Sequence, residues 1–115
     1  MNYADWDNPL IQSGRLYEVL RKYDMPFLVM EPVKGGSLAS AGKEIEAEMK
    51  RVHPDASIAS WALRFAASLP GVATVLSGMS NEEQMEDNIK TFRNFVPLNE
   101  EEKAVIAKAQ EALKK

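Results

Sequence analysis

A lysine beside two adjacent glycines, in the stretch VKGGS at residues 33–37, is the first group that could do chemistry. Glycine backbone can approach a phosphate closely, and a lysine ammonium can neutralise its charge. The stretch lacks the full spacing of a P-loop, however. From these residues alone, a plain loop between a strand and a helix is favoured over a phosphate site.

A second candidate is VATVLSGMSNEEQMEDNI, residues 72–89, which predicts a strand, a short glycine-containing loop and an amphipathic helix. The near-continuous apolar run at 72–76 predicts a parallel strand covered on both faces. Met85, Ile89 and Phe92 recur at i, i+4 and i+7, so they predict the buried stripe of the helix.

Two amides of this helix, Gln84 and Asn88, lie at the edge of that stripe, near the carboxyl end of the strand. Ligands of α/β folds sit at that end, where a helix amino terminus also offers N–H groups to an anion. The cap stays open between Ser80 and Asn81, because Ser80 with Glu83 and Asn81 with Gln84 both give a capping box. Without further evidence, a well-capped helix that binds no ligand is favoured.

The other ionisable residues do not predict a catalytic centre. His53, the only histidine, precedes Pro54 at a helix end, where a surface or dipole-stabilising role is favoured over proton transfer. Solvated helix faces are expected for Glu44, Glu46 and Glu48 and for the acidic run at 100–102. Cysteine is absent, so no disulfide and no thiolate metal site is expected, and no metal site of another kind is predicted.

Seven elements must position these candidates, in the order helix, strand, helix, helix, strand, helix, helix. Asn8 and Pro9 predict the start of the first helix, and the apolar run at 27–30 predicts the first strand. The small, polar loop at 35–43 is expected to be mobile unless a ligand orders it. A weakly patterned helix at 43–52 follows it.

The second half of the chain contains the remaining helices. Asp55 is predicted to cap a helix with apolar residues at 58, 61, 62, 65, 66 and 69, and residues 91–97 are predicted as a connector. Asn99 and Glu102 predict a capping box for the last helix. Its inward-facing residues are predicted to be Val105, Ile106, Ala109 and Leu113, with Lys114 and Lys115 at its negative end.

The 115 residues allow one domain, 1–115, and their 45% hydrophobic content suits a modest core. A net charge of −3 argues against a nucleic-acid surface, and no apolar run approaches the length of about 20 residues that spans a membrane. Polar residues directly after Met1 argue against a secretory signal. With the absence of cysteine, these features favour a cytoplasmic protein.

At SGMSNEEQMEDN the chain resembles the last strand, loop and helix of an aldo/keto reductase, the segment that holds the adenosine end of NADP(H). NYADWDNPLIQS, FLVMEPVKGGSLA and SIASWALRFAASLPGV resemble, in order, the three preceding segments of that family. The resemblance implies an α/β fold, a partial (β/α)₈ TIM barrel with two parallel strands and about five helices. A complete barrel needs about 250 residues, so the chain is expected to be a carboxy-terminal portion.

The resemblance also implies a set of cofactor-binding residues. The loop over the pyrophosphate would place Lys34, Gly35, Gly36, Ser37 and Leu38 in contact with it, and Met30 would take the place of the ring that often stacks on the nicotinamide. The segment SGMSNEEQMEDN would contribute Gly78, Met79 and Ser80, with Gln84 near the 2′-phosphate and Asp87 and Asn88 at the adenine. Because Glu82 and Glu83 repel a phosphate, the choice between NADP(H) and NAD(H) stays open.

The family's chemistry uses a tyrosine as general acid with lysine, aspartate and histidine neighbours from the first half of the barrel. No residue here matches those motifs, so no catalytic residue is predicted and cofactor binding is expected to be weak or absent in this chain alone. The expected function is the cofactor-binding portion of an NADP(H)-dependent oxidoreductase. The alternative is a non-enzymatic binding or assembly module that self-associates through exposed strand edges.

Overall fold

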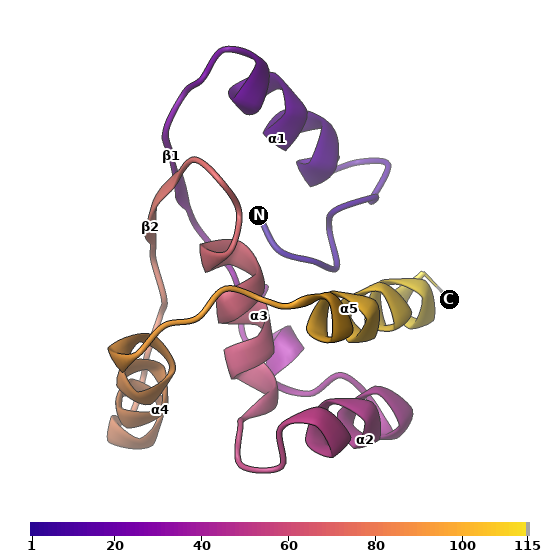
Figure 1. The fold of residues 1–115 in the computed structure, drawn as a ribbon, viewed down its shortest axis with the longest axis vertical. Helices are drawn as coiled ribbons and strands as arrows, with labels where there is room; N and C mark the ends of the chain where they lie inside the picture. Colours follow the sequence, from indigo (N-terminus) through magenta and orange to yellow (C-terminus); the bar gives the residue numbers. More distant parts are fainter. Residues whose placement is uncertain (115) are drawn as a thin grey trace.

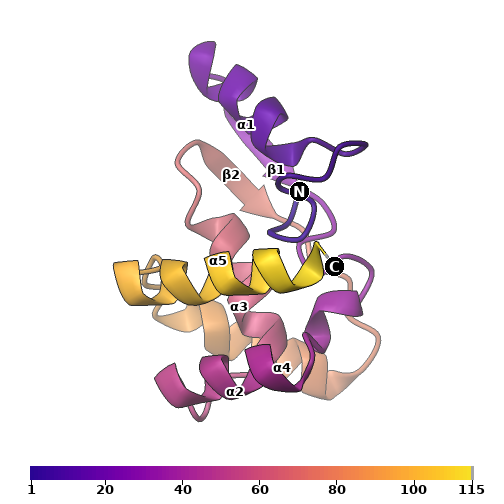
Figure 2. The ribbon, with the colours of Figure 1, turned by 90° about the vertical axis from the view of Figure 1, so that its right-hand side faces the viewer.

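Two parallel strands and five α-helices form the fold in a computed structural model, which describes residues 1–114 (Figures 1 and 2). The helices are α1 (Ser13–Lys22), α2 (Lys43–Val52), α3 (Ile58–Ala67), α4 (Glu82–Arg93) and α5 (Glu100–Leu113). The strands are β1 (Phe27–Val29) and β2 (Val72–Val75), and a 3-10 turn, η1 (Ser37–Ala39), follows β1. The predicted α/β class, a partial (β/α)₈ barrel, is confirmed in its element order and its parallel pairing.

β1 and β2 pair in parallel with Phe27 opposite Val72, Leu28 opposite Thr74 and Val29 opposite Val75. One face of this sheet is covered: Phe27 and Val29 pack with residues of α1 and α3. On the other face, Leu28 keeps 62% of its surface exposed. The prediction that the strand at 72–76 is covered on both faces is therefore wrong, because no described element lies over the second face of the sheet.

The main core lies around α3, which passes through the middle of the molecule between α4 on one side and the α2–α5 pair on the other (Figure 1). Trp61, Ala62 and Met49 are buried there, together with Val105 and Ile106 of α5. These residues were predicted from the apolar spacing of α3 and α5, apart from Met49. Leu113 was also predicted to face inward, but 42% of its surface is exposed. Lys115 lies outside the described residues.

Helix starts differ from the prediction at α1 and α3. Asn8 caps only a turn, its Oδ1 accepting the N–H groups of Leu10 and Ile11, and the helix begins at Ser13 after Gln12 adopts a left-handed conformation. At α3 the cap is Ser57, whose Oγ accepts the Ser60 N–H, rather than Asp55. The predicted connector at 91–97 is also too long, since α4 continues to Arg93.

The stripe predicted to be buried on α4 is largely exposed. Met85, Ile89 and Phe92 keep 49%, 54% and 38% of their surfaces accessible, and no residue of this helix is buried. The periodicity correctly predicted an amphipathic helix, but its apolar face has no cover among the described residues. No helix of the described chain combines the length and the hydrophobicity needed to cross a membrane.

Candidate functional site

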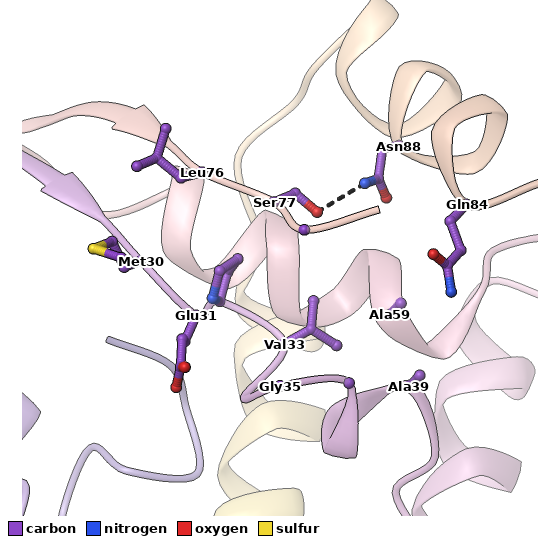
Figure 3. Close-up of a pocket in the computed structure, with 13 residues that line it drawn as sticks. Met30, Glu31, Val33, Gly35, Ala39, Ala59, Leu76, Ser77, Gln84 and Asn88 are labelled. Atoms are coloured by element: carbon purple, nitrogen blue, oxygen red, sulfur yellow. Dashed lines mark hydrogen bonds between the residues drawn. The ribbon is translucent and has the colours of Figure 1, made fainter. Parts of the chain in front are cut away.

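The carboxyl ends of β1 and β2 open into a cavity of about 450 Å³ (Figure 3). Met30 and Leu76 line it directly after the strands, and the loop that follows β1 closes one side. Ala59 of α3 forms part of the floor, and α4 contributes Gln84 and Asn88 from the opposite side. Its full lining is Met30, Glu31, Pro32, Val33, Gly35, Gly36, Ala39, Ala59, Leu76, Ser77, Gly78, Gln84 and Asn88.

Three glycines present bare backbone to this cavity. A Cβ added to Gly35, Gly36 or Gly78 would meet no atom within 4 Å. Gly35 and Gly36 have φ values of 60° and 88°, a left-handed conformation that favours glycine. Gly78 has no such φ and no crowding, so the local fold does not require a glycine there. Open backbone facing a cavity is suited to the close approach of a ligand.

The two amides of α4 are held in place by neighbours in the preceding loop. Asn88 donates from Nδ2 to the Ser77 Oγ at 2.8 Å. The Gln84 Oε1 accepts hydrogen bonds from the backbone N–H of Ser80 at 2.7 Å and from its hydroxyl at 3.1 Å. Asn81 is the cap of α4, its side chain accepting the Gln84 N–H at 2.9 Å, which settles the choice between the two capping frames. Both amides therefore have fixed positions at the cavity wall.

Six of the twelve predicted cofactor residues meet at this cavity: Met30, Gly35, Gly36, Gly78, Gln84 and Asn88. The other six do not line it. Among them, Lys34 places its Nζ 2.6 Å from the Asp5 Oδ1, and Asp87 accepts a 2.5 Å hydrogen bond from the Ser57 hydroxyl. Ser37 donates to the Lys34 carbonyl, Leu38 is buried in the main core, Met79 is exposed and Ser80 is bonded to Gln84.

Several lining residues were not predicted. Glu31, Val33, Leu76 and Ser77 directly follow the two strands, so the rule that ligands bind at the carboxyl ends of parallel strands could have identified them. Ala59 carried no comparable signal, because its place depends on how α3 packs against the loop after β1. The cavity wall is acidic, because Glu31 contributes a carboxylate and none of the described lining residues is lysine or arginine.

Tyr3 and Trp6 lie away from this cavity and serve packing. Tyr3 is 1% exposed, meets Phe65 edge-on with ring centroids 6.0 Å apart, and has no hydrogen-bond partner for its hydroxyl among the described residues. Its burial raises the pKa of the phenol to about 12. Trp6 meets Phe65 in the same edge-on manner at 5.3 Å.

A buried ion cluster joins three helices elsewhere in the molecule. Glu102 is 2% exposed and bonds Arg64 through both carboxylate oxygens, while its Oε2 lies 2.9 Å from the His53 Nε2. The prediction of a solvated face for the acidic run at 100–102 is therefore wrong for Glu102. Within the described chain, no group of three or more histidine, cysteine, aspartate or glutamate side chains could hold a metal ion.

Comparison with known proteins identifies a family for the chain. The model of the aldo/keto reductase family matches residues 2–111, which is nearly the whole chain and includes every residue that lines the cavity. No curated protein and no solved structure gave a match. Given the extent of the family match, the chain belongs to the aldo/keto reductase family of oxidoreductases.

Proposed function

We propose that the cavity at the strand ends binds a nicotinamide cofactor, NADP(H) or NAD(H), and that residues 1–115 form one cofactor-holding domain of an aldo/keto reductase-like oxidoreductase. The observation that carries this proposal is the bare backbone of Gly35, Gly36 and Gly78 around a cavity at the carboxyl ends of two parallel strands. When bound, the cofactor supplies the hydride that the parent reaction exchanges between a carbonyl and an alcohol.

Each part of the cavity suits one part of such a cofactor. The backbone of Gly35 and Gly36 can approach the pyrophosphate, and Gln84 and Asn88 can hydrogen-bond the adenosine end. Met30 offers a polarizable surface to the nicotinamide. The family resemblance also implies contacts by Lys34, Ser37, Leu38, Met79, Ser80 and Asp87, none of which lines this cavity. The carboxylates of Glu31, Glu82 and Glu83 disfavour a 2′-phosphate, so a strong preference for NADP(H) is not part of the proposal.

Cofactor affinity should be low, because the two strands and their loops supply only part of a dinucleotide site. We expect a dissociation constant on the order of 1 mM or weaker. N88A and Q84A should each weaken binding further, since each removes a fixed amide from the cavity wall. Calorimetric or NMR titration measures this, with N94A as the matched control on the far end of the same helix. Micromolar affinity, or equal affinity of all three variants, would contradict the proposal.

The purified chain should not reduce aldehydes with NADPH. General acid catalysis by a positioned proton donor contributes about 10²–10⁴-fold, and none of the described residues that line the cavity is a tyrosine, lysine or histidine that could be such a donor. Tyr3 is buried away from it, and Tyr17 donates its hydroxyl to the Pro70 carbonyl. The measurement is NADPH consumption with a panel of aldehydes. Turnover that copurifies with the chain through successive columns would show that a donor has been overlooked.

A second candidate function, self-association as an assembly module, is favoured by the exposed apolar surface. Leu28 on the open sheet face and Ile89 on α4 are 62% and 54% exposed. The free edges of a two-stranded sheet also offer unpaired backbone groups to another chain. A second copy that continues the sheet or covers its open face would bury both features.

A further inference from the structure

The loop between β1 and η1 holds an unusual backbone conformation. Glu31 and Lys34 have φ values of 52° and 51°, in the left-handed region that residues with a Cβ rarely adopt. Gly35 and Gly36 continue in the same region. Such conformations persist where surrounding contacts hold them. Because this loop carries two of the three glycines that line the cavity, whatever holds it also shapes the proposed cofactor site.

Asn2 and Asp5 hold both strained positions from outside the cavity. The Asn2 Nδ2 donates to the Glu31 carbonyl at 3.2 Å and to the Asp5 Oδ2 at 2.9 Å, and its Oδ1 accepts the Asp5 N–H at 3.0 Å. The other carboxylate oxygen of Asp5 receives the Lys34 ammonium at 2.6 Å. Asn2 and Asp5 are 1% and 7% exposed, so water competes little with the bonds between them, whereas the Lys34 side chain keeps 43% of its surface exposed. Neither residue lines the cavity.

We propose that Asn2, Asp5 and Lys34 are positioning residues for the cofactor: together they fix the glycine loop so that its backbone faces the cavity. This inference rests on the proposed function and assigns Lys34 a different task from a phosphate ligand. Its ammonium is engaged by the Asp5 carboxylate and links the loop to residues 2–5. Cofactor affinity then depends on an ion pair that does not touch the cofactor.

The two roles of Lys34 predict opposite effects of changing Asp5. If Lys34 binds a phosphate, Asp5 competes for its ammonium, so D5N should tighten cofactor binding while K34M weakens it. If Lys34 positions the loop, D5N and K34M break the same link. Each should then weaken binding about fivefold, the size expected for one partly exposed ion pair. The double variant should be no weaker than either single one.

The loop can be tested without any cofactor. Amide hydrogen exchange in the wild-type chain should be slow at Gly36 and Ser37, whose N–H groups bond the Val33 and Lys34 carbonyls. D5N and K34M should each speed exchange there about fivefold. K34R, which keeps the charge, should restore most of the protection. K108M is the matched control, since Lys108 pairs with Glu48 on the surface between α2 and α5.

The exchange of the His53 amide, at the end of α2, reports whether the core has also been weakened. Unchanged exchange at Gly36 and Ser37 in both variants would overturn the proposal, and so would tighter cofactor binding by D5N. If the wild-type chain binds no nicotinamide cofactor, the proposed function fails, yet the exchange measurement still decides whether the link between Asp5 and Lys34 holds the loop.

Discussion

Glu102 joins α3, α5 and the end of α2 through its hydrogen bonds to Arg64, Asn99 and His53. Its Oε1 also accepts the Asn99 N–H at 3.1 Å, so both of its oxygens are occupied. Burial opposes ionisation of this carboxyl, but the bonds from Arg64, from the Asn99 backbone and from His53 outweigh it and hold the pKa below its ordinary value. The folded state therefore favours the charged form.

Because that pKa is lower in the folded state, the stabilisation is complete above the ordinary carboxyl pKa and is lost as pH falls through the folded value. We expect acid to unfold the chain progressively at pH below about 4. The Asp5 pKa contributes in the same direction: burial opposes its ionisation, and the bonds from Lys34 and Asn2 lower it overall.

E102Q should lower the free energy of unfolding by roughly 3 kcal/mol near neutral pH, since it leaves the Arg64 guanidinium without its charge partner. It should also flatten the acid dependence of stability, although Asp5 leaves a residual slope. Urea unfolding at several pH values measures both effects. The control E101Q removes a more exposed carboxylate, so a loss of stability equal to that of E102Q would refute the special role of Glu102.

Among the helices and strands, features that depend on neighbouring residues were predicted better than features that depend on contacts between residues far apart in the sequence. The capping box of Asn99 and Glu102 is present as predicted, because all its atoms lie within one turn. The start of α1 was missed because it depends on packing: Trp6 lies against Gly14, where a Cβ would be 2.9 Å from the indole Nε1. The position of the cavity was predicted, because the strand ends mark it. The direction of the Lys34 side chain was not, because it depends on Asp5, 29 residues away.

N99A should destabilise the chain by about 1 kcal/mol, because it leaves the Glu102 N–H without its acceptor at the start of α5. The appropriate comparison is N94A, which makes the same change at the end of α4, where the residue has an ordinary negative φ of −126°. Thermal unfolding of both variants checks the effect. Equal stability of N99A and N94A would mean that α5 is held by its packing alone.

In the whole molecule, the open sheet face exposes apolar side chains such as Leu28 to solvent. We expect the chain to self-associate as its concentration rises, because apolar area and free strand edges can be covered by a second copy. L28K, on the open face, should shift the equilibrium toward the monomer. L10K makes the same change on a turn where Leu10 is already 91% exposed, so it should have little effect.

Sedimentation velocity across a concentration series measures whether the chain self-associates and whether L28K shifts it toward the monomer. A well-folded monomer at high concentration, with slow amide exchange in both strands, would show that the helices alone protect the sheet. In that event, the assembly function would be excluded and cofactor binding would be left as the function to test.

Binding of a nicotinamide cofactor at the strand ends can be measured by an NMR titration of labelled protein with NADPH. We expect fast-exchange shifts of the backbone amides of Gly35, Gly36, Gly78 and Asn88, saturating in the range of about 1–10 mM. Amides around the separate hollow formed by Tyr3, Asp7 and Gln110 should stay unchanged. Absence of shifts at the glycines, or shifts confined to that second hollow, would contradict it.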